Sequence, residues 1–481
     1  MLSKGVKFFC FYFFSFFLFG EEIIDGNYPL IYEKHIPWKL SGADDRIEEF
    51  RKGNISIEVI LEDGTELKPS QSVEIKQINH EFYFGGSLST DWSVPSRDWF
   101  GDFKNYFSNL FNYATVNFYW ASHEKARGKW NYEEAPLSRD ILNWALSENM
   151  TLKGHPLAWH QVLPNWISNE TRDVKKIDKD IRKHIKLLIT EFPEIDHWDT
   201  YNEVPGIRWE NENLGMRRWQ KYLGNVIKDG EFVSGPGFVI QEVMGIARPL
   251  LPNGFFVLNH YDHTDKYYHQ QIKYCLDNNI AFEAIGLQTH MHNVTQSFSE
   301  ETLWKMLETY TDYGKPIHLS EISILSCGKY EDWKGLKVQN DKWDYAVNNG
   351  LKIPTLDSLE KEELFQAHLT KDFYTLAFSH PNVEVITWWT MSDLDPWRGM
   401  PCGLLDEEGN PKPVYHVLDQ LINHDWKTNF SGVLDSSNKI EFRGFFGDYE
   451  ISLNANGKSY NGTFSLSKNK NNSYKLMLNE M

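Results

Sequence analysis

The alternation of apolar and polar positions changes twice along the chain and divides it into three regions. In residues 44–81 two short segments, Ile55–Leu61 and Ser72–Ile78, alternate apolar with polar side chains, as strands with one buried face do. Residues 82–425 carry short apolar runs separated by longer stretches of helical periodicity, and residues 426–481 return to the pattern of strands. We therefore expect a β-rich N-terminal segment, an α/β region and a small β-rich C-terminal appendage.

The α/β region contains apolar runs of the length and composition of strands, and helical patterns separate them. A (β/α)8 barrel is built from eight parallel strands that are each followed by a helix. The pattern therefore predicts an α/β fold in which residues 82–425 form a (β/α)8 TIM barrel. The eight runs are Tyr83–Ser89, Tyr113–Trp120, Thr151–Trp159, His197–Glu203, Phe255–Asp262, Ala284–Met291, Pro316–Ile324 and Val383–Asp393.

The C-terminal appendage contains alternating aromatic residues in the run Lys439–Leu453. Phe442, Phe445, Phe446 and Tyr449 could form either the core of a small β-domain or a platform that faces a sugar. We expect a core, because alternating aromatic side chains more often pack than bind.

A short apolar segment precedes all three regions. Lys4 and Lys7 stand before the run Phe8–Phe19, which is too short to span a bilayer and has the length of the apolar region of a signal peptide. We expect residues 1–20 to be a signal peptide, the mature chain to begin near Glu21, and the protein to be secreted and extracellular, without a membrane partner once the signal is removed. A membrane-anchoring helix is the alternative.

Charge and cysteine content exclude several classes of partner. The chain has 49 Lys and Arg against 67 Asp and Glu, a formal net charge of −18, which repels nucleic acid and anionic lipid. Outside the signal, Cys275, Cys327 and Cys402 show no C-x-x-C spacing, so neither a disulfide framework nor a zinc site is indicated. We expect no nucleic-acid partner, no metal, no cofactor and a monomer. The aromatic share of 15% suits a protein that stacks rings against a neutral sugar.

Polar residues gather where the predicted barrel strands end, which is the end that carries the functional groups of such barrels. Glu203 ends the fourth run, and Glu321 lies near the end of the seventh. Glycoside hydrolysis uses two carboxyl groups on either side of the scissile bond, so this pair indicates a sugar hydrolase. The alternative for either residue alone is a helix cap or a surface salt bridge. The other residues at these ends are His155, Trp159, His160, Asn202, Gln288, His290, Trp389 and Asp393.

Several motifs in this region resemble glycoside hydrolase family 10, a family of retaining endo-β-1,4-xylanases with a (β/α)8 fold. The acid/base motif W-D-x-x-N-E of that family is matched at Trp198–Glu203, and the nucleophile segment at Leu319–Ile322. The matches follow the order of the family over most of the α/β region. The remaining ones are G-H-x-L-x-W-H at Gly154–His160, G-L-Q-x-H at Gly286–His290, and the closing segments Val385–Arg398 and Leu404–Leu418.

The resemblance implies a role for each matched residue. Glu203 would be the general acid/base and Glu321 the nucleophile of a double displacement. Asn202 would hold the 2-hydroxyl of the sugar that is cleaved, while Gln288 and His290 would orient Glu321; a core histidine is the alternative for His290. The other implied sugar contacts are His155 and Trp159 on the same sugar, Asn117 on the next one, and Trp389 and Trp397 as aromatic walls, with barrel filling as the alternative for Trp389.

The chain departs from the family pattern in two places. The second strand of the family ends E-N-x-x-K-W, whereas Val116–Trp120 keeps Asn117 and has neutral or apolar residues for the Glu and the Lys. A lysine carries three donors, so its loss changes how sugar hydroxyls can be held. In the nucleophile motif E-L-D, the Asp is replaced by Ser323, so His290 loses a carboxylate partner that would favour its charged form.

The sequence thus predicts a secreted, retaining glycoside hydrolase that cleaves internal β-1,4 linkages of a xylan-type polysaccharide. Two alternatives stay open at this point. One is a barrel glycosidase that acts on another β-glycan, and the other is a carbohydrate-binding protein without turnover.

Overall fold

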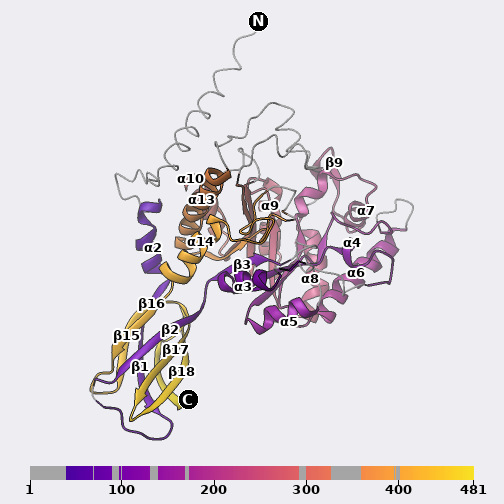
Figure 1. Ribbon diagram of the computed structural model, residues 1–481. Coiled ribbons are helices and arrows are strands. Elements are labelled where there is room, and N and C mark those ends of the chain that lie inside the picture. The colour runs from indigo at the N-terminus through magenta and orange to yellow at the C-terminus, as the bar shows by residue number, and fades with distance from the viewer. Residues whose placement is uncertain are drawn as a thin grey trace.

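The structure is a computed structural model. It describes residues 39–68, 70–88, 97–98, 100–130, 139–167, 173–233, 235–291, 300–326, 359–394, 396 and 401–481. The predicted signal peptide, Cys327 and Trp397 lie outside these residues. A helix-covered barrel and a smaller β-domain make up the described chain (Figure 1).

Eight parallel strands close into a barrel, so the predicted fold is confirmed. Every strand lies within one of the eight apolar runs of the sequence, because each run supplies the side chains that pack between the barrel and its helices. In order around the closed ring, the strands are β11 (Phe255–His260), β12 (Ala284–Met291), β13 (Ile317–Ile324), β14 (Val383–Trp388), β3 (Tyr83–Ser87), β4 (Tyr113–Asn117), β5 (Thr151–His155) and β7 (His197–Asp199).

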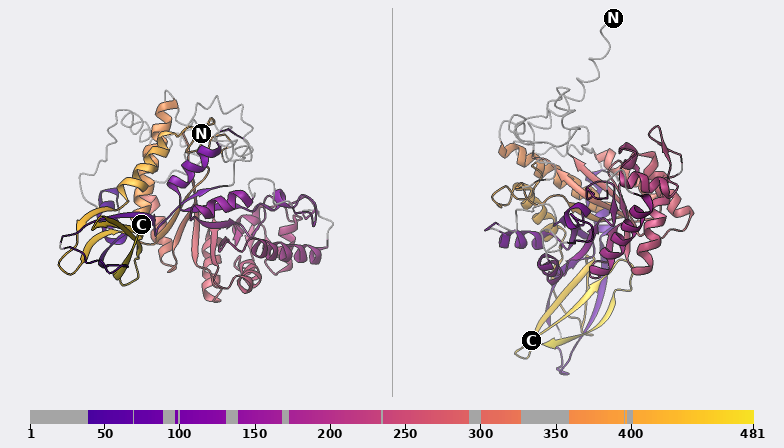
Figure 2. Two further views of the ribbon diagram at one scale, coloured as in Figure 1. Left: turned by 60° about the horizontal axis from the view of Figure 1, so that its bottom comes forward. Right: turned by 90° about the vertical axis from the view of Figure 1, so that its right-hand side faces the viewer.

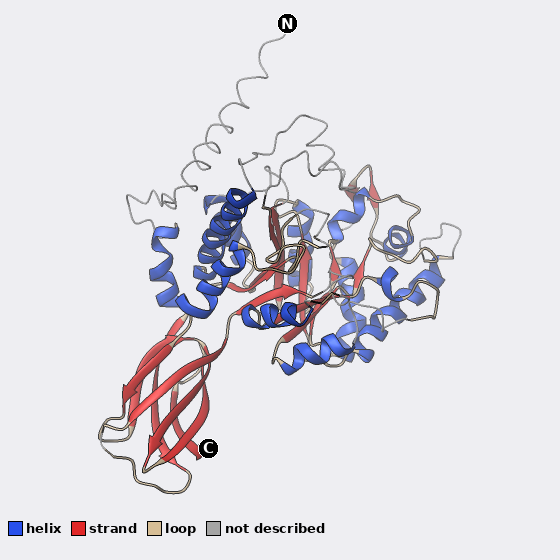
Figure 3. Ribbon diagram, in the orientation of Figure 1, coloured by secondary structure: helices blue, strands red, loops and turns tan. Residues whose placement is uncertain are grey.

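Helices follow the strands and surround the barrel (Figure 3). Asp173 and Asp265 cap α6 and α9, since each carboxylate accepts a hydrogen bond from the backbone N–H two residues on. The described helices of this layer are α3 (Phe100–Leu110), α4 (Trp120–His123), α5 (Arg139–Ser147), α6 (Val174–Glu191), η3 (Val204–Trp209), α7 (Gly215–Tyr222), α8 (Phe238–Leu250), α9 (Lys266–Asp277), α10 (Glu300–Thr311), α13 (Leu359–Ser379), α14 (Pro413–Asp419) and η5 (Gln420–Asp425).

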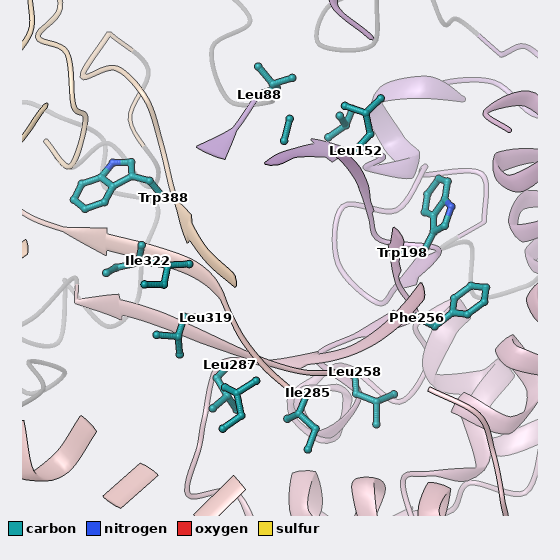
Figure 4. Packing of buried hydrophobic residues seen from close by; sticks show 14 of the residues in the cluster. Leu88, Leu152, Trp198, Phe256, Leu258, Ile285, Leu287, Leu319, Ile322 and Trp388 are labelled. Atoms are coloured by element: carbon teal, nitrogen blue, oxygen red, sulfur yellow. The ribbon is translucent and has the colours of Figure 1, made fainter. Parts of the chain in front are cut away.

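Two kinds of side chain alternate along the barrel strands. The apolar ones, such as Leu152, Trp198 and Leu258, are buried in one large hydrophobic cluster that includes residues of the covering helices (Figure 4). Their neighbours Lys153 and Asp199 point the other way and bond to each other within the barrel. The period of two in a strand thus directs one set of residues to the helices and the other to the interior and mouth of the barrel.

Four two-residue strands complete the loops at the mouth of the barrel. In chain order they are β6 (Ala158–Trp159), β8 (Tyr201–Asn202), β9 (Ile227–Lys228) and β10 (Glu231–Phe232). β6 pairs with β8 in parallel, so Trp159 lies beside Asn202. β9 and β10 form a small hairpin.

The β-rich segments at the two ends of the chain form one seven-stranded sheet. β1 of the N-terminal segment pairs with β16 and β19 of the C-terminal one, and β2 pairs with β15 and β17. Local sequence patterns do not report such pairing between distant segments. The strands are β1 (Lys52–Leu61), β2 (Ser72–His80), β15 (Asn429–Val433), β16 (Lys439–Phe445), β17 (Gly447–Ala455), β18 (Lys458–Leu466) and β19 (Ser473–Glu480).

The aromatic residues of this β-domain pack inward, as predicted for a core. Phe442 and Tyr449 are buried in a hydrophobic cluster of the β-domain, and Phe446 packs against it. Phe445 joins the cluster of the barrel. The start of the N-terminal segment differs from the expectation: α2 (Ala43–Phe50) precedes β1 and follows the short turn η1 (Leu40–Gly42).

The β-domain lies at the end of the barrel where the strands begin. β2 ends at His80 and β3 begins at Tyr83, so the sheet adjoins the amino ends of the barrel strands. In Figure 2 the β-domain lies at the lower left of the left view and at the bottom of the right view, at one end of the molecule. Because barrel enzymes carry their chemistry at the opposite, carboxyl ends of the strands, the β-domain is remote from the predicted site.

Candidate active site

Glu203 stands at the mouth of the barrel in an unusual backbone conformation. It follows β8, precedes the 3₁₀ helix η3, and has a φ of 57° in the left-handed region. Residues other than glycine adopt this conformation rarely, and such positions cluster at functional sites. The side chain is buried, with 8% of its surface exposed.

Two donors hold the carboxyl group of Glu203. Gln288 Nε2 donates to Oε1 at 2.8 Å, and Trp159 Nε1 donates to Oε2 at 3.1 Å. Gln288 thus bonds Glu203, and not Glu321 as the family resemblance implied. Burial raises the pKa of Glu203 above its usual value, and the charge of Glu321 raises it further; the two donors oppose the shift. The result is a carboxyl group that keeps its proton to higher pH than an exposed glutamate does.

Glu321 on β13 faces a different set of partners. Asn259 Nδ2 donates to Oε1 at 2.8 Å, His290 Nε2 lies 3.1 Å from Oε2, and His155 Nε2 lies 3.9 Å from Oε1. Burial raises the pKa of Glu321 above its usual value, whereas His155 and Lys153 oppose the shift. These basic groups face Glu321 and not Glu203, so they favour the ionised carboxylate at Glu321.

A chain of side-chain amides joins the two carboxyl groups. Asn202 Oδ1 accepts from Asn259 Nδ2 at 3.1 Å and from Gln288 Nε2 at 3.5 Å. Each of these donors also bonds one glutamate, so the order is Glu203, Gln288, Asn202, Asn259, Glu321. The sequence prediction missed Asn259, although it lies near the carboxyl end of β11 as the predicted residues lie near the ends of their strands.

His290 bridges the nucleophile candidate and Ser323. Ser323 Oγ lies 2.6 Å from His290 Nδ1, and the two residues are direct neighbours in the pairing of β12 with β13. A carboxylate can only accept, so Nε2 must carry the proton that is donated to Glu321. Nδ1 of a neutral ring then accepts from the hydroxyl of Ser323. His290 therefore contacts Glu321, as predicted, and is not a core histidine.

A buried ion pair lies beneath the site. Lys153 Nζ is 3.0 Å from Asp199 Oδ2, which also accepts from His155 Nδ1 at 2.6 Å. Burial raises the pKa of Asp199, but Lys153 and His155 outweigh this effect, so the pKa of Asp199 lies below its usual value. Sequence analysis missed Lys153, whose signal is a lysine two residues before His155 in an apolar run.

The aromatic candidates contact residues of the same site. The ring of Trp389 is fully buried and lies 5.5 Å from that of His155 and 6.4 Å from that of His290, so it both fills the barrel mouth and borders the site. Tyr119, which stands in the altered second-strand motif, lies 5.4 Å from the ring of Trp159. Burial raises the pKa of Tyr119, and the charges of Glu321 and Glu203 add to the shift.

Two buried amides at the site have donors or acceptors to spare. Asn117 is buried in register with His155, and neither its Oδ1 nor its Nδ2 has a partner among the described residues. Asn202 Nδ2 is likewise unpartnered in the described part of the chain. Buried polar atoms of this kind are costly unless something bonds them. A sugar hydroxyl is such a partner.

Other candidates take structural places or lie outside the described residues. Asp393 bonds Lys412 Nζ at 2.6 Å and the N–H of Gly403, which fastens the loop after β14. His160 is buried with its ring stacked on Tyr201. In the described residues, no group of three or more His, Cys, Asp and Glu side chains could hold a metal ion, and no described helix is long and apolar enough to cross a membrane.

The site and its fold define a class. Two buried carboxyl groups joined by hydrogen bonds at the carboxyl ends of barrel strands are the arrangement of a glycoside hydrolase. The Glycosyl hydrolase family 10 profile matches residues 78–420, which is more than half of the 481-residue chain. The chain belongs to Glycosyl hydrolase family 10.

Individual relatives are distant and differ in how much of the chain they match. The chain is 22% identical over 451 residues to the anti-sigma-I factor RsgI6 of Acetivibrio thermocellus, a match that covers 92% of this chain and 50% of that protein. It is 21% identical over 350 residues to endo-1,4-beta-xylanase B of Thermotoga neapolitana, with 70% and 87% covered. The chain thus spans half the length of one relative and most of the other.

The structural neighbours agree on the fold. Native xylanase 10B from Thermotoga maritima matches with a TM-score of 0.52 and 17% identity, covering 72% of this chain and 96% of that chain. An endoxylanase of the same family from a sugarcane soil metagenome also has a TM-score of 0.52, with 19% identity and 71% and 96% covered. These neighbours resemble the barrel of the present chain.

Proposed function

We propose that the protein is a secreted, retaining glycoside hydrolase that cleaves internal β-1,4 linkages of xylan-type polysaccharides. The observation that carries the proposal is the chain of hydrogen bonds from Glu203 to Glu321, in which one carboxyl group has only uncharged donors and the other has basic groups beside it. Membership of Glycosyl hydrolase family 10 supports glycoside hydrolysis. The xylanases among the relatives support xylan as the substrate.

The two carboxyl groups divide the reaction between them. The ionised carboxylate of Glu321 attacks the anomeric carbon, and Glu203 gives its proton to the departing glycosidic oxygen. A covalent glycosyl-enzyme results. Glu203, now ionised, takes a proton from water as the water attacks the same carbon from the side that the leaving group has vacated. The bond to Glu321 breaks, and the sugar regains its original configuration.

The surrounding side chains hold the sugar and the nucleophile. Asn202 Nδ2 is buried without a partner in the described residues, so it can donate to the 2-hydroxyl of the sugar under attack. His290 and Asn259 fix the two oxygens of Glu321, and Gln288 fixes Glu203. The amide of Asn117 is available to the next sugar. Tyr119 supplies a neutral phenol beside Trp159.

Secretion is the second part of the proposal. The basic residues Lys4 and Lys7 before the run Phe8–Phe19 support a cleaved signal peptide. A polysaccharide is too large to enter a cell, which agrees with an extracellular enzyme. N-terminal sequencing of the protein recovered from the medium of the expressing cells should begin near Glu21.

The test is release of reducing sugar from xylan, arabinoxylan, mannan and β-glucan by the wild type and by Glu203→Ala and Glu321→Ala. We expect the wild type to act on the xylans. Each variant should lose hydrolysis, because general acid–base catalysis alone contributes about 10²–10⁴-fold to the rate. Each should retain its affinity for the polysaccharide. Activity on mannan or β-glucan alone would overturn the proposal that xylan is the substrate. Hydrolysis that survives Glu321→Ala would overturn the assignment of Glu321 as the nucleophile.

A further inference from the structure

Trp209 is the most exposed large aromatic side chain near the site. It ends the helix η3, which begins directly after Glu203, and 69% of its surface is open to solvent. A tryptophan is among the costliest side chains to leave in water, because it carries a large apolar surface. Its place on the segment that positions Glu203 connects it with the site.

The indole of Trp209 is held rigidly from one side. The guanidinium of Arg208 lies 4.6 Å from the centre of the Trp209 ring, and Arg208 itself is largely buried and bonds Asp265 and the carbonyl of Pro205. Gly230 in the hairpin of β9 and β10 approaches an edge of the ring, where a Cβ would lie 3.6 Å from Cζ3. One face is therefore supported while much of the ring stays open.

The distance from Glu203 suits a subsite beyond the scissile bond. A 3₁₀ helix rises about 2.0 Å per residue, so the six residues from Glu203 to Trp209 span about 12 Å. This distance is greater than the length of a single sugar ring, so Trp209 is too far from Glu203 to contact only the sugar under attack.

The strand order fixes the side of the site on which Trp209 lies. Arg208 is anchored on Asp265, which follows β11, and Trp209 follows β7 and β8, so the ring lies over the β7–β11 part of the barrel. Trp389 follows β14, on the opposite side of the closed ring. His155, which is placed on the sugar under attack, and Asn117, which is placed on the next sugar, belong to β5 and β4 and not to β7 or β11. A sugar chain that continues past Glu203 therefore runs toward Trp209.

We propose that Trp209, supported by Arg208, is a stacking platform for the sugar chain on the leaving-group side of the scissile bond. Its ligand is a neutral β-linked oligosaccharide whose ring faces present C–H groups to the indole. The inference rests on the proposed function and deepens it, because it concerns how the same site grips its substrate. It makes Trp209 a binding residue and gives it no part in the chemical step.

The experiment compares substrates with long and short leaving groups. Trp209→Ala, Trp209→Phe and the control Tyr222→Ala are assayed for kcat/KM on xylohexaose and on an aryl β-xylobioside, whose leaving group is a single ring. Tyr222 is another exposed aromatic residue, on α7, and no part of the site described above. Thermal unfolding of each variant verifies that it is folded.

We expect Trp209→Ala to lower kcat/KM on xylohexaose by about tenfold, which corresponds to about 1.4 kcal/mol. The loss on the aryl xylobioside should be much smaller, Trp209→Phe should be intermediate, and Tyr222→Ala should match the wild type. Equal losses of kcat/KM on both substrates, or no loss on xylohexaose, would overturn the role of Trp209 as a stacking platform. Failure of the wild type on both xylan substrates would instead overturn the proposed substrate, and the same comparison would then use oligosaccharides of the glycan that is cleaved.

Discussion

Ser323 Oγ lies 2.6 Å from Nδ1 of His290, and the opposite nitrogen of the same ring lies 3.1 Å from Glu321. A hydroxyl therefore stands where the family pattern has a carboxylate. It can select the tautomer of His290 by donating to Nδ1, but it supplies no negative charge that would hold the ring as a cation.

Ser323→Asp tests this difference. The new carboxylate should raise the pKa of His290 relative to the wild type, and a cationic ring then lowers the pKa of Glu321. Since Glu321 must be ionised to attack, the acidic limb of the pH profile of kcat/KM should move to lower pH. Ser323→Thr, which keeps the hydroxyl, should leave the profile in place. Profiles of wild type and Ser323→Asp that superimpose would show that this contact does not tune the nucleophile.

Trp159 offers a second titration test, on the acid side. Its indole N–H donates to Glu203 and favours the ionised carboxylate, so Trp159→Phe should raise the pKa of Glu203. A general acid is active while it keeps its proton, and the basic limb of the kcat/KM profile should therefore move to higher pH, together with a lower maximum. A basic limb that moves to lower pH would contradict the assignment of Glu203 as the acid.

The buried pair of Lys153 and Asp199 should matter for stability. Both side chains are almost fully buried, and removing one partner of such a pair typically costs about 3–5 kcal/mol because the other charge is left uncompensated. Lys153→Met should lower the free energy of unfolding in urea by about this amount. The double variant Lys153→Met with Asp199→Asn should recover part of it. A double variant less stable than the sum of the two single changes would contradict a direct pairing.

The shared sheet changes what a truncation does. Ending the chain at residue 425 removes five strands and leaves β1 and β2 without partners, so the buried residues Ile57, Val59 and Ile75 lose their cover. We expect this truncation to aggregate, as measured by light scattering. A chain that also lacks residues 39–81 should aggregate less. If the truncation at 425 stays monomeric and hydrolyses soluble oligosaccharides, the pairing of the two ends is dispensable.

The sequence predicted the barrel well because its strands are locally encoded. Each of the eight strands lies in an apolar run with polar residues at its carboxyl end, and these ends bring Glu203, Gln288, His290 and Glu321 together, although Gln288 bonds Glu203 and not Glu321. Contacts that depend on pairing between distant segments were harder to foresee. The joint sheet of β1 with β16 is one example.

The residues missed in the site have the same explanation. Lys153 and Asn259 act through partners far away in the sequence, Asp199 and Glu321, and nothing in their own segments reveals those partners. A rule that flags every polar residue on an inward position of a barrel strand would have found both. Asn117, Trp159 and Trp389 lie at the site, and their roles toward the sugar stay predictions. Trp397 lies outside the described residues.

The central claim is that Glu321 attacks the sugar and Glu203 protonates the leaving oxygen, and the configuration of the first product tests it most directly. Proton NMR of xylohexaose hydrolysis, recorded before mutarotation equilibrates the new reducing end, separates the α and β anomers. Double displacement through a glycosyl-enzyme predicts that the β anomer forms first. Initial formation of the α anomer would contradict a covalent intermediate on Glu321.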